Sequence, residues 1–384
     1  MRSVLFFLLF SCTFAQAQST LGDPELTSYT WYLGGQWDSL YQHRKALVEQ
    51  SVQDYFYLRY RLGVASFYKE KYRTAIDECY KALHFNSSDT FTLKLLEVSL
   101  LESGRNHEAL LAAKRLRKLG AAPIPRYRPA SLNTISADMG IKFSNSVFID
   151  NLTYKGIGLG IYPIAPLLVQ ANVSNIQQSN YYGSVVQNTF TGFTRYQFSK
   201  GLALYGHFSN LNITIDFDDK THRSMRNSVG GIGVKKALGN WDVEIGIDKG
   251  NLNDSNQTQE NIGITWYPLS NPNLSFRSSL ICQQQSAKTH YSYKLGMAVK
   301  LLPHLWLSAD YYKGNTRNII ENSGFFINNA YDVVHARSSA ALTWIPGRKF
   351  SAFVAASYEM RTETFEEFDY TLTGIFSGIR FSPW

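Results

Sequence analysis

The feature that most constrains the fold is a two-residue alternation of apolar and polar side chains, which runs through most of the chain beyond residue 133. In HYSYKLGMAVKLL, residues 290–302, Tyr291, Tyr293 and Leu295 begin an apolar face, and the intervening positions are polar or small. The runs at 241–248 and 350–360 alternate in the same way. Successive side chains of a strand point to opposite faces, so the pattern predicts amphipathic β-strands.

Turn-like and longer polar connections separate these strands, of which we expect about fourteen between residues 133 and 382, with twelve or sixteen as alternatives. An even number of antiparallel strands, with tight turns on one side and longer loops on the other, is typical of an outer-membrane β-barrel. We expect the longer connections to be external loops, and none is long enough to supply a plug domain. These connections lie at 215–222, 253–257 and 315–330.

Composition agrees with this class. Aromatic residues make up 14% of the chain and charged residues 18%, and no segment beyond the N-terminus has eighteen consecutive apolar residues, so a helical membrane span is not expected. The alternative fold is a soluble β-sandwich. The formal net charge of +8 suits anionic lipid head groups or an acidic polymer better than nucleic acid in an exported chain.

The N-terminus, MRSVLFFLLFSCTFAQAQS, predicts export. Arg2 is followed by an apolar run at 4–10 and by the small-x-small sequence Ala15-Gln16-Ala17, so residues 1–17 are expected to be a cleaved secretory signal. Lipidation at Cys12 is the alternative. Cys79 and Cys282 are then expected to be unpaired structural thiols.

The first third of the chain has helical spacing, and the stretch 62–83 resembles a tetratricopeptide repeat, with related spacing 34 residues further on. The resemblance implies a helical domain at 18–120 whose helix pairs stack, with its concave face binding another chain or, alternatively, a bare spacer. The residues expected to pack the repeats are Leu62, Gly63, Tyr72, Ala75, Ala82, Gly104 and Ala109.

A proline-rich segment follows this domain. Pro123, Pro125 and Pro129 predict an extended linker at 121–132, so that the barrel domain covers 133–384.

The chain ends in GIFSGIRFSPW, and its aromatic residues Phe381 and Trp384 resemble the C-terminal signal read by the machinery that assembles outer-membrane barrels. Other aromatic residues gather near predicted strand ends, where tryptophan and tyrosine prefer the membrane interface. These are Tyr162, Trp241, Trp266, Tyr267, Trp306 and Trp344.

The sequence contains no recognisable catalytic motif, so we do not expect an enzyme. We also expect no cofactor and no metal. His207 and Ser209 form a pair of the kind that any strand supplies, and the acidic pair Asp218-Asp219 is expected to be solvated. The predicted inward faces carry charges that form either a salt-bridged wall or a polar path. The basic residues expected in the lumen are Arg195, Lys235, Arg277, Lys294, Lys300 and Arg337.

A signal, tetratricopeptide-like helices and a C-terminal barrel together resemble the polysaccharide-export barrels and the surface-lipoprotein assembly modulators. The resemblance implies an outer-membrane location, with the helical domain in the periplasm binding a protein or polymer partner, and outer-membrane lipids around the barrel. Two functions remain open: a conduit or assembly factor for a polymer or protein, and a structural or anchoring protein without transport.

Overall fold

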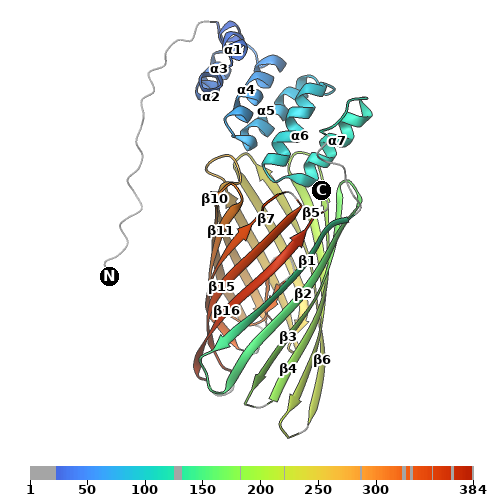
Figure 1. Ribbon diagram of the computed structural model, residues 1–384, viewed down its shortest axis with the longest axis vertical. Helices are drawn as coiled ribbons and strands as arrows, with labels where there is room; N and C mark the ends of the chain where they lie inside the picture. The colour runs from blue at the N-terminus through green and yellow to red at the C-terminus, as the bar shows by residue number, and fades with distance from the viewer. Residues whose placement is uncertain are drawn as a thin grey trace, which may run out of the picture.

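The computed structural model describes residues 23–124, 132–181, 183–219, 221–285, 288–321, 326–328, 332–347, 349–364 and 367–382. A helical domain stands on one end of a tall barrel (Figure 1). Its helices are α1 (Pro24–Leu33), α2 (Trp37–Gln42), α3 (Arg44–Gln50), α4 (Phe56–Tyr68), α5 (Tyr72–Phe85), α6 (Thr90–Glu102) and α7 (Asn106–Lys118). Within the described residues no helix combines the length and apolarity needed to cross a membrane.

The last four helices form two pairs that repeat with a period of 34 residues, since α4 begins at Phe56 and α6 at Thr90. Gly63 of α4 faces α5 and α6, where an added Cβ would lie 3.5 Å from Cys79 Sγ and from Leu95. Gly104 has φ of +76° at the turn between α6 and α7, a conformation that favours glycine. The small side chains thus let the helices pack closely.

Most of the residues expected to pack the repeats are buried. Leu62 is 1% exposed, and Ala75, Ala82 and Ala109 are fully buried. Tyr72 begins α5 and contacts the ring of Phe67. Cys79 and Cys282 are both unpaired, and burial raises the pKa of the Cys79 thiol.

The second part is a closed antiparallel barrel of fourteen strands, as predicted, in which β1 pairs with β16 to complete the wall. Closure leaves no unpaired edge. The barrel strands are β1 (Leu132–Ser144), β2 (Ile149–Ile164), β3 (Leu167–Asn180), β4 (Gly183–Gln197), β5 (Leu202–Phe217), β6 (His222–Leu238), β7 (Trp241–Leu252), β8 (Ser255–Trp266), β9 (Leu274–Gln285), β10 (Lys288–Leu302), β11 (Leu305–Thr316), β14 (Val333–Trp344), β15 (Phe350–Thr362) and β16 (Asp369–Phe381).

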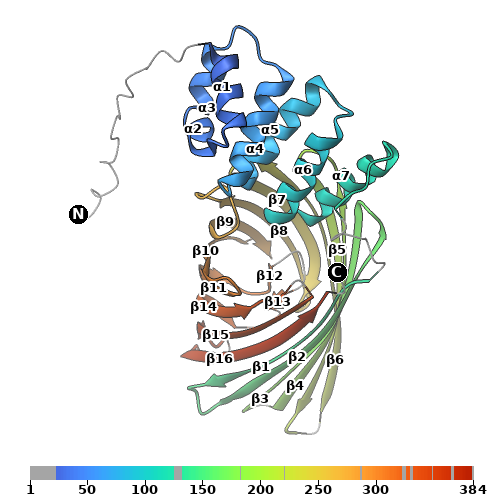
Figure 2. The same ribbon diagram turned by 45° about the horizontal axis from the view of Figure 1, so that its top comes forward.

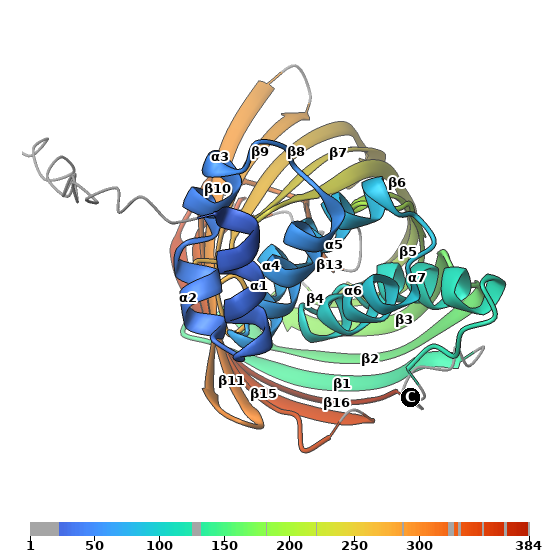
Figure 3. The same ribbon diagram turned by 90° about the horizontal axis from the view of Figure 1, so that it is seen from above.

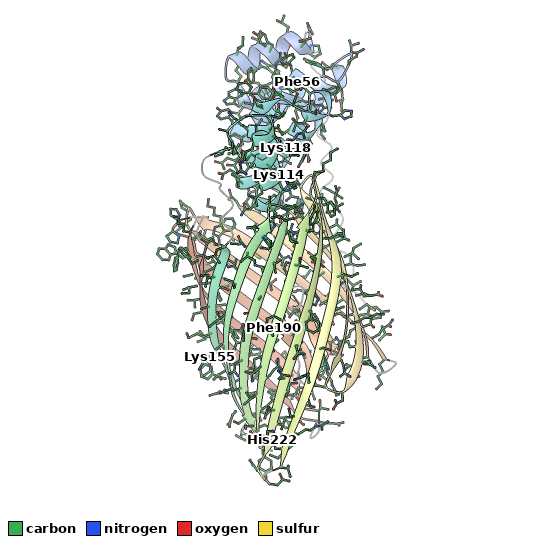
Figure 4. The ribbon with its side chains drawn as sticks, turned by 90° about the vertical axis from the view of Figure 1, so that its right-hand side faces the viewer. Phe56, Lys114, Lys118, Lys155, Phe190 and His222 are labelled. Carbon is green, nitrogen blue, oxygen red and sulfur yellow. The ribbon has the colours of Figure 1, made fainter. Side chains whose placement is uncertain are left out.

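The apolar faces predicted from the alternation point outward. Ile232 is 68% exposed, Tyr291 67% and Val354 59%, and these positions alternate with inward residues along their strands. Figure 4 shows Phe190 and Lys155 on the outer surface of the barrel and His222 at the end remote from the helices. We call the end that carries the helical domain the helix end, and the opposite end the far end.

The predicted contrast between short and long connections is mostly wrong. At the far end β5 and β6 are joined by 218–221, and 253–254 joins β7 to β8, so most of 253–257 is strand. Polar residues continue the strands there, on the outward face of β5 and on both faces of β8, which made the sequence resemble a loop. The connection after β11 is the long exception, and it is not simply an external loop.

That connection folds into the barrel as a hairpin of β12 (Ile319–Glu321) and β13 (Phe326–Asn328). Figure 2 shows both strands inside the ring of barrel strands. The sequence predicted no plug domain, but it did not predict that this shorter hairpin enters the lumen. The stretch 315–330 reads as polar because its buried apolar residues, among them Ile319, Ile320 and Ile327, are few and are interrupted by polar ones.

Several predictions fall outside the described residues. These are the signal at 1–17, lipidation at Cys12, most of the linker including Pro125 and Pro129, and Trp384. Phe381 is described, and it ends β16 between Ile135 of β1 and Phe350 of β15.

Candidate functional site in the barrel lumen

Helices lie across the mouth of the barrel at the helix end, as the view from above shows (Figure 3). Two of them, α5 and α7, bond directly to the turns that join the strands. The helical domain is therefore part of any path through the lumen at this end.

Arg73, at the start of α5, is buried against the barrel. Its guanidinium donates to the carbonyl of Gly239 at 2.6 Å, to that of Trp241 at 3.1 Å and to Asp242 Oδ1 at 2.5 Å. The same group lies 4.2 Å from the centre of the Tyr267 ring, and the side chain of Arg73 is 2% exposed. A buried arginine with a carboxylate and an aromatic face holds its position strongly.

Ser270 adds a second tie from the β8–β9 connection. Its carbonyl accepts the backbone N–H of Arg73 at 2.9 Å, and its hydroxyl accepts the N–H of Thr74 at 3.0 Å. These bonds occupy orphan donors in the first turn of α5, which every helix must satisfy. The barrel therefore caps the helix.

Glu108 of α7 bonds to the β4–β5 turn. Its carboxylate accepts the backbone N–H of Gly201 at 2.9 Å, pairs with Arg105 at 2.5 Å and accepts the hydroxyl of Tyr80. Burial, followed by the nearby Glu108 charge, raises the pKa of Tyr80. The carboxylate is thus shared between two helices and the barrel.

An apolar contact completes this interface. Leu110 of α7 packs with Tyr162 and Leu168 of the barrel, and the ring of His107 meets that of Tyr162 edge to face at 5.2 Å. Burial, with the positive charge of Arg195, lowers the pKa of His107 to about 3. The imidazole is therefore neutral at the interface.

The hairpin of β12 and β13 is bound to one wall of the lumen. Side-chain amides of Gln257 and Gln259 on β8 donate to the carbonyls of Asn318 and Ile320, at 2.8 Å and 2.6 Å. Glu321 pairs with Lys294 of β10 at 3.2 Å and with Arg337 of β14. The hairpin is thus fixed by both backbone and ionic contacts.

A cavity of about 2010 Å³ occupies the other side of the lumen, toward the far end. Inward side chains of β1 to β6, β15 and β16 line it, with Ile327 of the hairpin and connections at the far end. It is the candidate functional site, because a closed wall encloses a space large enough to hold or pass another molecule.

The basic residues predicted to line the lumen lie on inward-facing strand positions, in different surroundings. Lys294 and Arg337 pair with Glu321, and Lys235 lies 3.2 Å from Asp242 Oδ2. Arg195 donates to Gln197 at 2.9 Å. The remaining two, Arg277 and Lys300, are exposed. None of these six lines the cavity, whose basic residues are Lys142, Arg223 and Arg361.

Three of the aromatic residues predicted at the membrane interface lie elsewhere. Tyr162 and Tyr267 contact the helical domain, and Trp306 pairs with Lys300 on the inward face. By contrast, the rings of Trp241 and Trp266 stack at 5.7 Å on the outer surface. Proximity to a strand end therefore did not determine which face an aromatic residue occupies.

The histidine considered for chemistry has a structural partner. His207 Nε2 lies 2.6 Å from Asp248 Oδ1, and Asp248 Oδ2 accepts Asn261 at 2.7 Å. The hydroxyl of Ser209 lies 3.0 Å from that of Thr191. Among the described residues no cluster of three histidine, cysteine or acidic side chains has the arrangement of a metal site.

Sequence reasoning missed Arg73, Glu108 and Glu321. The first two bind the helical domain to the barrel, and Glu321 binds the hairpin to the barrel wall. Each lies in a segment read as repeat or loop, where a charged residue is ordinarily solvated. The signal available was weak: Glu108 is the single charge in an otherwise small and apolar stretch, EALLAA.

Comparisons with known proteins show similarity in fold only. No family model matches the chain. No curated protein matches it either.

Among solved structures, the chain is similar to CymD, a monoaromatic hydrocarbon channel, with 7% identity over 66% of this chain and 89% of that one, at a TM-score of 0.49. It is similar to the outer membrane protein Omp33 of Acinetobacter baumannii, with 10% identity, coverage of 66% and 99%, and a TM-score of 0.39. A bacterial polysaccharide outer membrane secretin has 9% identity, coverage of 66% and 99%, and a TM-score of 0.40. We take no function from these likenesses.

Proposed function

We propose that this protein is an outer-membrane barrel that works as a gated conduit, with its helical domain in the periplasm. The observation that carries the proposal is the cavity of about 2010 Å³ inside a barrel whose outer surface is apolar. An exposed apolar band around a closed antiparallel barrel is favourable in a lipid bilayer and unfavourable in water. The signal predicted at 1–17 and the assembly signal predicted at Phe381 and Trp384 support the same location.

The helical domain is proposed to be a tetratricopeptide-like docking platform for a periplasmic protein or polymer. The 34-residue period of the helix pairs supports this reading. Exposed aromatic residues on the helices offer contact area, with Tyr57 61% exposed, Tyr68 60% and Phe91 69%. Because α5 and α7 bond to barrel turns, a partner bound here would act directly on the mouth.

The hairpin of β12 and β13 is proposed to limit flow through the resting conduit. Replacing Glu321 with glutamine removes the carboxylate that pairs with Lys294 and Arg337, and breaking a buried ion pair typically costs about 3 to 5 kcal/mol. We expect the hairpin to leave its seat more often and the lumen to widen.

Single-channel recording in planar bilayers tests this function. The full-length protein is expected to show low conductance, and the Glu321→Gln variant larger and longer open steps. Lys313→Gln, an exposed position on β11, is the matched control and should leave the record unchanged. Heat-modifiable migration on gels verifies that each variant forms a barrel.

A structural or anchoring role is the second candidate, and one observation favours it: both the hairpin and the helices obstruct the lumen. It predicts electrical silence in the wild type and in Glu321→Gln, with both folded and inserted. That outcome would overturn the conduit.

A further inference from the structure

The cavity has a wall whose chemistry departs from that of an ordinary barrel lumen. Interiors of membrane barrels are usually polar, because water fills them. Here apolar side chains of four neighbouring strands make up much of the lining, with the polar Gln178, Asn180 and Gln187 between them. The apolar ones are Leu152 and Tyr154 of β2, Ile176 of β3, Val185 of β4, and Ile213 and Ile215 of β5.

The hairpin covers the opposite wall and binds it through both polar and apolar contacts. The amides of Gln257, Gln259 and Gln283 donate to hairpin carbonyls or to the carbonyl of Arg317 at its base. Ile320 of the hairpin is 2% exposed and packs against Leu211 and neighbouring barrel residues. The lumen is therefore divided into a half that the hairpin fills and an open half whose lining is rich in apolar side chains.

The size of the open half suits an elongated molecule. Its volume of about 2010 Å³ is about twice the upper end of small-molecule pockets, which typically span about 300 to 1,000 Å³. Phe353 of β15 and Phe376 of β16 extend the apolar lining toward the middle of the barrel. Burial of apolar surface contributes roughly 25 cal/mol per Å², so such walls select long apolar chains.

The charges that line the cavity indicate the head group. Six acidic side chains line it against three basic ones. Of the basic ones, Arg223 pairs with Asp254 at 2.6 Å, and Lys142 pairs with Glu359 at 2.6 Å. A concave site with an excess of one sign attracts the opposite sign. Aromatic faces in the lining also favour cations.

We propose that the open half of the lumen binds an amphiphile with a long alkyl or acyl chain and a positively charged amine head group. The chain lies along the apolar wall of β2 to β5, and the amine lies among the acidic side chains. This proposal rests on the function proposed above, since it names the class of molecule that the conduit takes.

Photo-crosslinking tests the binding directly. The full-length protein in lipid nanodiscs is irradiated with a dodecyl amine that carries a diazirine in its chain, and in parallel with the matched dodecanoic acid probe. Labelled peptides are mapped by mass spectrometry. We expect the amine to label the inward positions of β2 and β5, at least tenfold more than the acid does, while both label the outward band from the lipid.

Two variants sharpen the test. Leu152→Arg places a positive charge on the apolar wall and should lower amine labelling of β5 at least tenfold. Thr153→Arg, the next residue on β2, carries the same charge on the opposite face and should leave that labelling unchanged. Heat-modifiable migration shows that both variants fold.

Labels confined to the outward band with both probes would overturn the proposal, and equal labelling of the cavity by amine and acid would overturn its head group. Conductance is recorded on the same preparation. Absent cavity labelling in a conducting barrel refutes the amphiphile and leaves the conduit, whereas labelling in a silent barrel refutes the conduit alone.

Discussion

Arg73 is expected to hold the helical domain on the barrel, and its replacement by methionine should release that domain without unfolding either part. The change removes a buried pair with Asp242 and the contact with the Tyr267 ring. Breaking such a pair costs about 3 to 5 kcal/mol. Lys235 remains 3.2 Å from Asp242 Oδ2 and offsets part of the loss.

A net loss of about 3 kcal/mol changes the ratio of docked to undocked molecules about 150-fold, since about 1.4 kcal/mol corresponds to tenfold. Hydrogen exchange followed by mass spectrometry reads this ratio through the amide of Gly201, which donates to Glu108 of α7 at 2.9 Å. That amide should exchange about 150-fold faster in Arg73→Met, while amides in the middle of β7 stay protected.

Lys81→Met is the matched control, because Lys81 lies on the same helix with its side chain 48% exposed. It should leave the exchange of Gly201 unchanged. If Arg73→Met accelerates that exchange less than threefold, the arginine does not hold the interface. If the barrel amides accelerate equally, the domain does not undock as a unit.

Three further outcomes follow from the same contacts. The pKa of His107 is lowered to about 3 in the docked state, so this state binds fewer protons than the undocked one. Docking therefore loses about 1.4 kcal/mol of stability per pH unit as pH falls from 6.5 toward 3. The exchange of the Gly201 amide, corrected for its intrinsic pH dependence, should accelerate on acidification, and should do so less in His107→Gln. Ala109→Leu overfills a fully buried site and should lower the thermal midpoint of the helical domain, at a cost of about 1 to 3 kcal/mol, as circular dichroism checks. Deleting residues 381–384 should block barrel assembly, and normal amounts of heat-modifiable protein would contradict this.

The barrel was predictable because its signal is local. Alternation within each strand, as in 290–302, follows from the geometry of extended backbone, and strand number follows from counting such runs. The period of the helix pairs is local as well.

The hairpin and the docking contacts depend on partners far along the chain, so periodicity does not report them. Arg73 and Asp242 are 169 residues apart, and Gln259 lies 61 residues from the Ile320 carbonyl that it binds. The apolar inward wall was also missed, because Ile215 lies in the stretch 215–222, whose polar residues resemble a loop.

Cysteine accessibility in intact cells tests the central claim most directly. His222→Cys lies at the far end (Figure 4), and Val52→Cys lies in the helical domain, where Val52 is fully exposed. With a membrane-impermeant maleimide, we predict that the cysteine at 222 is labelled in intact cells, and that the one at 52 is labelled only after the outer membrane is permeabilised. Labelling at 52 in intact cells, or recovery of the protein in the soluble fraction without detergent, would contradict an outer-membrane barrel with a periplasmic helical domain.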